Sequence, residues 1–403
     1  MKKPLRIGLV MAGGRSWIGG IEYIRNLVLA LNSLPADVRK TFELCLICPP
    51  EMEQVFYGDL RACVDRIYQL EDAMSKRTLV NLLRWKARSI LSHQRAPRFD
   101  AFIRKEKIDF VYPHLPDRQS LKEYRSAAWI PDFQHKHLPG FFIEEEVKVR
   151  DLSCKTIASQ APVVVFSSRT VMSDFHQFYP QATGKAAVMS FKTYCQPQWF
   201  EVDPLRVQRE YNLPDRFLMV CNQFWKHKNH HVVFEALKLL RARSIFPVIV
   251  CTGHINDYRH PAYSDEILQV IQRSGIAQQV HLMGLIPRSD QIQLMRRSLG
   301  VIQPSLSEGW STVVEDARAL GKPVILSNLP VHQEQDPPKG IFFDPASPES
   351  LASILADKWR EFLPGPDLEQ EVVARTRNAV EMRDYGNRFL EIVNGTVGHC
   401  ILR

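Results

Sequence analysis

The sequence has no hydrophobic run long enough to cross a bilayer. A transmembrane helix needs roughly 18 apolar residues without charge, and no window of the 403 residues approaches this composition. The N-terminal apolar run from Leu5 to Ala12 is short, contains Arg6 and ends in glycines without a small-residue cleavage site. It is typical of a strand rather than of a signal peptide, so we expect neither an integral membrane protein nor an exported one.

Cysteine is also scarce, with eight residues in the chain. Without an export signal, we expect reduced thiols, no disulfides and a cytoplasmic protein. Cys45 and Cys48 lie in the apolar run FELCLIC, where period-two alternation directs them to opposite faces of a strand. Buried packing is therefore favoured over redox chemistry or a zinc site.

The rest of the composition is that of an ordinary globular protein. Apolar residues make up 45% and charged residues 24% of the chain, which excludes wholesale disorder, a collagen and a coiled coil. A chain of 403 residues is too long for one hydrophobic core, so we expect two or three domains of about 150 residues each.

Short apolar runs alternate with segments of helical period along both halves of the chain. They read LRIGLVMA, FELCLIC, IDFVY, AAWIP and APVVVFSS in the first half, then RFLMVCNQ, FPVIVCTG, VHLMG, LGVIQPS, PVILS and GIFFD. This pattern predicts an α/β fold with two Rossmann-like doubly wound domains that face each other across a cleft. A polar, proline-containing passage separates them, so we place the domains at 1–195 and 205–365, and a final helix of about 372–393 could pack back on the first.

The net charge of +8 allows an anionic partner without identifying it. Much of the excess lies in residues 76–98, which contain seven Lys or Arg and no Asp or Glu. This segment could lie on anionic lipid at the inner face of the membrane as a basic amphipathic helix. Alternatively, it is a surface helix that packs on its own domain. No recognised nucleic-acid-binding motif occurs, so we expect no nucleic-acid partner.

The most informative stretch reads PSLSEGWSTVVEDARALGKPVI. Gly309 allows close approach of a ligand to the backbone, and Ser311 and Thr312 are good caps for the helix that follows. Such a helix start carries unpaired N–H groups and partial positive charge, which suits a diphosphate. Glu308 and Glu315 flank the turn and could accept hydrogen bonds from sugar hydroxyls. Alternatively, Glu315 is a first-turn carboxylate that merely suits the helix dipole.

This stretch resembles the sugar-nucleotide signature of the retaining glycosyltransferases of family four, which have the two-domain GT-B fold. In that family two glutamates bracket a glycine-rich turn, and a run like ALGKPVI follows. The resemblance implies that Glu308 lies by the transferred sugar and that Glu315 holds the ribose of the nucleotide. Six residues separate the two glutamates here, whereas the family pattern has seven.

A second stretch, CNQFWKHKNHHVVFEAL, resembles the phosphate-binding turn of the same family. Lys228 falls where the family places its diphosphate lysine. Five residues earlier the family commonly has arginine, whereas this chain has Gln223, and a neutral amide cannot replace a bidentate guanidinium. Lys226 or His227 could supply the missing charge, or Lys226 could belong to a solvated basic turn.

Two N-terminal features resemble the acceptor side of the family. Gly19 and Gly20 do not fit the G-x-G-x-x-G fingerprint, but they resemble the family's glycine-rich turn near the donor phosphates and the acceptor, with a purely structural turn as the alternative. In WIPDFQHKHLPGFF, Asp132 and a histidine follow the end of a strand, where they could meet a substrate. We prefer His135 to His137, and either could be structural.

With backbone groups near Gly284 and Ile286 expected at the nucleobase, the resemblance extends over nearly the whole chain. It implies a hexosyltransferase of polysaccharide biosynthesis that moves a sugar from a nucleotide sugar to a hydroxyl of a saccharide or lipid-linked saccharide, with retention of configuration. Lys228 and the helix start at Ser311 would stabilise the departing diphosphate. No D-x-D pair occurs in the sequence, so we expect no metal requirement and no cofactor besides the donor.

Other functions fit the same scaffold. A catalytically inactive nucleotide-sugar-binding protein would explain Gln223 and the shortened spacing between the glutamates. A sugar-nucleotide epimerase or a phosphorylase is a further alternative, because a fold does not fix a reaction. An epimerase would change the sugar without any acceptor.

Overall fold

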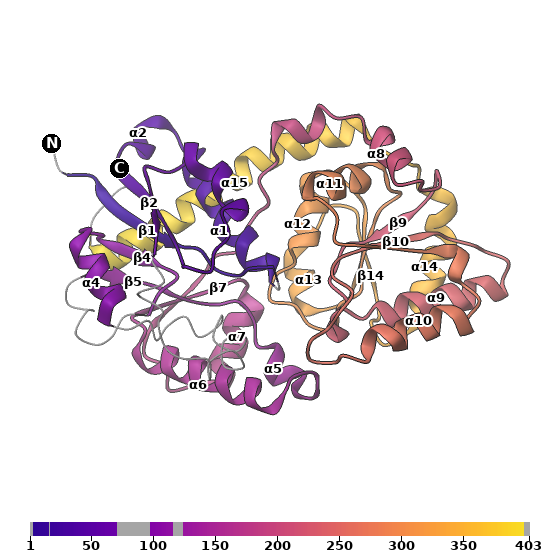
Figure 1. Ribbon diagram of the computed structural model, residues 1–403, viewed down its shortest axis with the longest axis horizontal. Coiled ribbons are helices and arrows are strands. Elements are labelled where there is room, and N and C mark those ends of the chain that lie inside the picture. The colour runs from indigo at the N-terminus through magenta and orange to yellow at the C-terminus, as the bar shows by residue number, and fades with distance from the viewer. Residues whose placement is uncertain (1–2, 16, 71–96, 116–123, 399–403) are drawn as a thin grey trace. The chain divides into compact units, whose positions relative to one another are not determined.

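The computed structural model describes residues 3–15, 17–70, 97–115 and 124–398 (Figure 1). The chain divides into two compact units: unit 1 comprises 1–136, 144–194 and 380–403, and unit 2 comprises 137–143 and 195–379. Most of the basic segment 76–98 lies outside the described residues, so its contact with a membrane stays a prediction. None of the helices in the described ranges has the length and apolarity that a membrane crossing requires.

Unit 1 contains two parallel sheets, with strand orders β3-β2-β1-β4-β5 and β6-β7-β8. Their strands are β1 (Leu5–Val10), β2 (Phe42–Cys48), β3 (Arg66–Gln69), β4 (Phe110–Tyr112), β5 (Arg125–Ser126), β6 (Ala128–Ile130), β7 (Val163–Phe166) and β8 (Lys185–Val188). Ala127 alone separates β5 from β6. Its N–H donates to the carbonyl of Val111 (3.3 Å), and its own carbonyl accepts from the N–H of His114 (2.9 Å). One extended run therefore pairs with β4 by its first half and with β7 by its second half.

Unit 1 also contains helices, and the first of them buries an apolar face. They are α1 (Ile18–Asn32), α2 (Ala36–Arg39), α4 (Pro97–Lys105), α5 (Gln134–His137), α6 (Glu144–Gln160), α7 (Arg169–Phe178) and the second part of α15 (Leu368–Val397). In α1 the buried residues Ile24, Leu27 and Leu31 recur at helical spacing on one face. Ser168 caps α7, since its hydroxyl accepts from the N–H of Val171. Local sequence therefore sets both the start of α7 and the buried side of α1.

Unit 2 is built on one parallel sheet with the strand order β11-β10-β9-β12-β13-β14. These strands are β9 (Leu218–Val220), β10 (Ile249–Thr252), β11 (Val280–Gly284), β12 (Val301–Gln303), β13 (Val324–Ser327) and β14 (Gly340–Phe343). Numbered within the unit, the order is 3-2-1-4-5-6, that of a nucleotide-binding doubly wound sheet. The chain reverses its direction of winding between β9 and β12, which lie side by side. The predicted α/β class with parallel sheets is confirmed.

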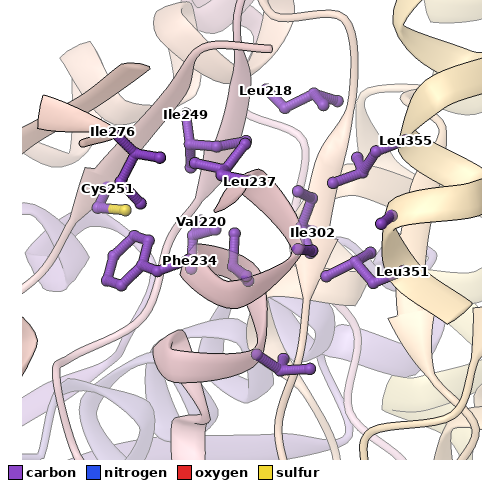
Figure 2. Close-up of a cluster of buried hydrophobic side chains, with 14 of the residues drawn as sticks. Leu218, Val220, Phe234, Leu237, Ile249, Cys251, Ile276, Ile302, Leu351 and Leu355 are labelled. Atoms are coloured by element: carbon purple, nitrogen blue, oxygen red, sulfur yellow. The ribbon is translucent and has the colours of Figure 1, made fainter. Parts of the chain in front are cut away.

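Both faces of this sheet are covered. The helices are α8 (Pro204–Glu210), α9 (His230–Ala242), α10 (Tyr263–Arg273), α11 (Arg288–Arg297), α12 (Thr312–Ala319), α13 (Pro330–Gln335) and α14 (Pro348–Glu361). Along β9, Leu218 and Val220 join the core beneath α9 and α14 (Figure 2), whereas Met219 joins the core beneath α11 and α12. This period-two alternation explains why the strands read as continuous apolar runs.

Helix α15 takes part in both units, because its residues up to 379 belong to unit 2 and the rest belong to unit 1. In unit 1 the ring of Phe389 lies 6.0 Å from that of Phe110 and 5.4 Å from that of Tyr112, measured between centroids. Phe389 is fully buried. The core of unit 1 is therefore completed by the far end of the chain.

Candidate functional site

The two motifs that the sequence singled out in the second half of the chain lie next to each other in unit 2. One follows β9 and the other follows β12, and these strands are neighbours at the reversal of strand order. The N–H of Leu306 donates to the carbonyl of His227 (2.8 Å), and the amide of Asn222 donates to Oε1 of Gln303 (2.9 Å). Ligands of open parallel sheets bind at the carboxyl ends of such strands, so this edge is the candidate site.

Lys228 and Glu308 form the centre of the site. The ammonium Nζ of Lys228 lies 2.5 Å from Oε1 of Glu308, and the two side chains are 17% and 7% exposed. The same carboxylate oxygen accepts hydrogen bonds from Nε2 of Gln303 (2.8 Å) and from the hydroxyl of Ser305 (2.7 Å). Gln303, at the end of β12, and Ser305, in the loop after it, therefore fix the carboxylate, which in turn fixes Lys228.

The turn that carries Lys228 is a single 3-10 turn, Lys226–Lys228. It ends at Asn229, whose left-handed backbone (φ 54°) leads into α9, and whose side-chain amide donates to the carbonyl of Pro345 (3.0 Å). The ammonium of Lys226 lies 5.7 Å from the ring centroid of Phe141, and His227 is buried. Gln223 is half-buried in the same loop.

At the start of α12, Glu315 is more than a surface carboxylate. It is almost fully buried, and its Oε1 accepts from Nε2 of Gln335 (2.9 Å) while Oε2 lies 3.7 Å from Nε of Arg318. Gln335 also exchanges hydrogen bonds with the backbone N–H and carbonyl of Ser311, and the hydroxyl of Ser311 caps the helix. Gln335, on α13, therefore ties Glu315 to the helix start. Gly309 is buried in the loop before α12, and Thr312 is its first residue.

A further layer of polar groups supports this loop from behind. The hydroxyl of Ser327 donates to the carbonyl of Ser305 (2.6 Å), and Nδ1–H of His332 donates to the carbonyl of Ser327 (2.8 Å). His332 is fully buried, and burial lowers its pKa. The neutral ring of His332 thus fixes Ser327 at the end of β13. Ser327 in turn fixes Ser305, whose hydroxyl bonds to Glu308.

Gly284 and Ile286 lie at the end of β11, on the other side of β10 from the two motif loops. Gly284 has a left-handed backbone (φ 64°) with open space where a Cβ would stand, and its carbonyl accepts from the N–H of Gly253 (2.8 Å). Ile286 is half-buried against the core beneath α11. Both residues belong to the same sheet edge as Lys228.

In unit 1, Gly19 and Gly20 begin α1 and lie beneath the indole of Trp17. A Cβ on Gly20 would stand 2.9 Å from the Trp17 ring, too close for any side chain. Trp17 in turn stacks on Trp129 at 5.7 Å, which stacks on Tyr23 at 3.9 Å. The glycine pair therefore has a packing reason that the sequence did not reveal.

Asp132 and His135 lie at the start of α5 in the same unit. Oδ1 of Asp132 accepts from the N–H of Gln134 (3.0 Å), and Nε2 of His135 lies 3.1 Å from Oδ1 of Asp151. The His135 side chain is 1% exposed, and burial lowers its pKa. His137 is exposed and belongs to unit 2. Asp151, on α6, is a partner that sequence reasoning missed.

Residues 202–378 match the family of glycosyl transferases group 1. The chain is 22% identical over 290 residues to the O-antigen chain mannosyltransferase B of Escherichia coli. The aligned region covers 68% of this chain and 73% of that relative. It is also 22% identical over 151 residues to the O-antigen biosynthesis glycosyltransferase WclY of Escherichia coli, covering 37% of this chain and 39% of the relative.

Solved structures share the fold over nearly the whole chain. A glycosyltransferase from Rickettsia africae superimposes with a TM-score of 0.65 at 17% identity, covering 97% of this chain and 98% of that one. Anabaena HepE in complex with UDP and glucose has a TM-score of 0.65 at 16% identity, covering 96% of this chain and 99% of that one. Sucrose-phosphate synthase from Thermosynechococcus elongatus has a TM-score of 0.66 at 16% identity, covering 96% of this chain and 100% of that one. The fold is therefore GT-B.

Proposed function

We propose that this protein, a glycosyltransferase by its family match and its relatives, moves a sugar from a nucleotide-sugar donor to a hydroxyl of a saccharide or lipid-linked saccharide, with retention of configuration. The family match covers almost all of unit 2, including both motif loops. Neighbours in fold bind UDP and UDP-glucose, and the two relatives are named for O-antigen synthesis. These similarities support a nucleotide-sugar donor and a saccharide acceptor.

The observation that carries the proposal is the fixed position of Lys228. When the bond from the anomeric carbon to the phosphate breaks, negative charge develops on the diphosphate. An ammonium already held in place stabilises that charge without reorganisation, which is often the largest contribution to catalysis. Glu308 holds Lys228, and Gln303 and Ser305 hold Glu308. Glu308 would then both orient the lysine and face the transferred sugar.

We assign the remaining candidate residues either to the parts of the donor, which are its diphosphate, ribose and nucleobase, or to the acceptor. The helix start at Ser311 would add its N–H groups to the diphosphate site, Glu315 would accept from the ribose hydroxyls, and Gly284 with Ile286 would border the nucleobase. Asp132 and His135 would serve the acceptor. Because the sequence has no D-x-D pair, metal-independent transfer is part of the proposal.

The test begins with the wild-type protein and a panel of nucleoside diphosphates and nucleotide sugars. A ligand of the folded state raises the unfolding temperature, so one base should stand out in a thermal-shift screen. With that donor and an acceptor panel, Lys228→Ala should lower turnover by about tenfold or more. Lys238→Ala is the matched control, because Lys238 is exposed and pairs with Glu235 on the same helix, α9. Unchanged turnover in Lys228→Ala would refute the proposal.

A nucleotide-sugar-binding protein without catalysis is the second candidate. Gln223, which stands where the family commonly has arginine, and the shortened spacing from Glu308 to Glu315 favour it. Tight nucleotide binding with no product across a broad acceptor panel would decide for this candidate. Conversion of the donor sugar without any acceptor would instead identify an epimerase.

A further inference from the structure

Residues 137–143 belong to unit 2, although the chain on both sides of them belongs to unit 1. Their aromatic residues contact the loop after β10. The guanidinium carbon of Arg259 lies 4.7 Å from the ring centroid of Phe142 and 4.7 Å from that of Trp225. The Arg259 side chain is only 3% exposed. A desolvated guanidinium against two aromatic rings is an energetically significant contact.

Asp257 connects this arginine to the turn that carries Lys228. Its Oδ1 accepts from the backbone N–H (3.0 Å) and from Nε (3.4 Å) of Arg259. Its Oδ2 accepts from the backbone N–H of Lys226 (3.0 Å). The Asp257 side chain is 1% exposed, so one buried carboxylate holds the arginine with one oxygen and the first residue of the turn with the other.

The turn needs such support, because it has little structure of its own. Within the turn, the N–H of Lys228 donates to the carbonyl of Trp225 (2.7 Å), and the N–H of Asn229 donates to the carbonyl of Lys226 (3.2 Å). One turn of 3-10 helix is a weak element. Arg259 contacts Trp225, the residue before the turn, and Asp257 accepts from the N–H of Lys226, the first residue of the turn. Lys228 follows two residues later.

We propose that Arg259 is a positioning residue for Lys228, and that residues 137–143 complete the diphosphate site by covering Arg259 with Phe142. This inference rests on the proposed function. It gives the segment after His135 a task in donor binding: the guanidinium holds the turn in place, and the phenyl ring excludes water from the guanidinium. A displacement of about 1 Å at a charged catalytic group is enough to lower a rate strongly.

Two variants test it without leaving a buried charge unpaired. Arg259→Lys keeps the charge opposite Asp257 but removes the planar guanidinium. Phe142→Leu keeps apolar volume but removes the aromatic face. Arg216→Lys is the matched control, because Arg216 lies 5.2 Å from the ring centroid of Trp359 in the same unit and bonds to the carbonyl of Phe362, away from the turn.

The measurement is the dissociation constant of UDP and of GDP by titration calorimetry, beside the unfolding temperature of each variant. For the nucleotide that the wild type binds, we expect Arg259→Lys and Phe142→Leu to raise the dissociation constant by about tenfold, and Arg216→Lys to leave it unchanged. Dissociation constants within about twofold of wild type in both test variants would overturn the inference, since that is well below the tenfold that 1.4 kcal/mol produces.

A double variant separates positioning from general loss of stability. If Arg259 acts through Lys228, then Arg259→Lys adds little to the effect of Lys228→Ala on nucleotide binding, whereas independent effects would multiply. Multiplication would overturn the inference. A wild-type protein that binds no nucleoside diphosphate or nucleotide sugar of the thermal-shift panel would instead refute the proposed function, and the inference with it.

Discussion

The ammonium of Lys228 and the carboxylate of Glu308 are in contact at 2.5 Å across 80 residues of sequence. The contact arises because each residue follows one of two adjacent strands at the reversal of the sheet. Under the proposed function, Lys228 would lie against the diphosphate and Glu308 against the transferred sugar.

Replacing Glu308 by Gln should separate binding from turnover. The variant keeps the shape of the side chain but removes a negative charge beside Lys228, so a nucleoside diphosphate should bind at least as tightly as to wild type. Turnover should fall by about tenfold or more, because the carboxylate charge is lost from the sugar side, while the amide oxygen can still accept from Lys228. Calorimetry with steady-state kinetics measures both quantities. Weaker binding with unchanged turnover would contradict this role.

Gln335 should matter for the donor although it lies on a separate helix. Gln335→Leu removes the hydrogen bond to buried Glu315 and both bonds to the Ser311 backbone. We expect a loss of about 1–3 kcal/mol in unfolding free energy and a higher donor KM. Gln333→Leu on the same helix is the control, because Gln333 is exposed and bonds to exposed Asn328. Equal effects of the two substitutions would remove Gln335 from the site.

Acid should destabilise unit 2 through a buried histidine. Burial lowers the pKa of His230 to about 3, and its ring stacks on Phe224 at 3.9 Å. The unfolded chain, with an ordinary pKa near 6.5, binds the proton first, so stability is full above that pH and falls as the pH drops toward 3. Between pH 7.5 and 5 the loss should be about 2 kcal/mol from this residue.

His230→Phe should therefore flatten the pH dependence. Denaturant unfolding at pH 7.5 and pH 5 gives the free-energy difference for wild type and variant. Phenylalanine has no titrating group and can keep the stack on Phe224. An unchanged difference in the variant would show that other groups, such as His332 and His281, whose pKa values burial also lowers, dominate the acid response.

Two glycines at the candidate edge should respond differently to alanine. Gly253 and Gly284 both have positive φ, but a Cβ on Gly253 would stand 2.3 Å from the carbonyl oxygen of Asn222, whereas one on Gly284 would meet nothing within 4 Å. Gly284→Ala should cost about 1 kcal/mol of backbone strain. Gly253→Ala should cost about 3 kcal/mol or more, because the backbone of Asn222 must move. Similar unfolding midpoints for the two variants would contradict the packing described.

Sequence reasoning reached the parts of the site that local patterns encode. The apolar runs predicted the strands, and the residues after β9 and β12 are the ones that meet in space. It missed Gln335, on α13, and Asp257 and Arg259, in the loop after β10, because none of them belongs to a motif. Only the fold brings them to the turn and the helix start. Polar residues directly after β10 and on α13 were the available signal.

Helix α6 shows a second reason for failure. Its residues were not among the expected helices, because its apolar positions are few and polar Glu146 and Ser153 are buried beside Cys154. The stability of such a helix comes from what it packs against, here β7 and α7, rather than from its own pattern. Asp151, the partner of His135, was missed together with the helix that carries it.

The burial of Phe389 against Phe110 and Tyr112 has a consequence for biosynthesis. Because a ribosome synthesises the chain from the N-terminus to the C-terminus, every residue of unit 2 has been made before Phe389 is added. Unit 2 can become complete while unit 1, which was begun first, still lacks its closing helix. The domain encoded first is thus the one finished last, and the apolar side chains that Phe389 covers stay exposed on the nascent chain until then.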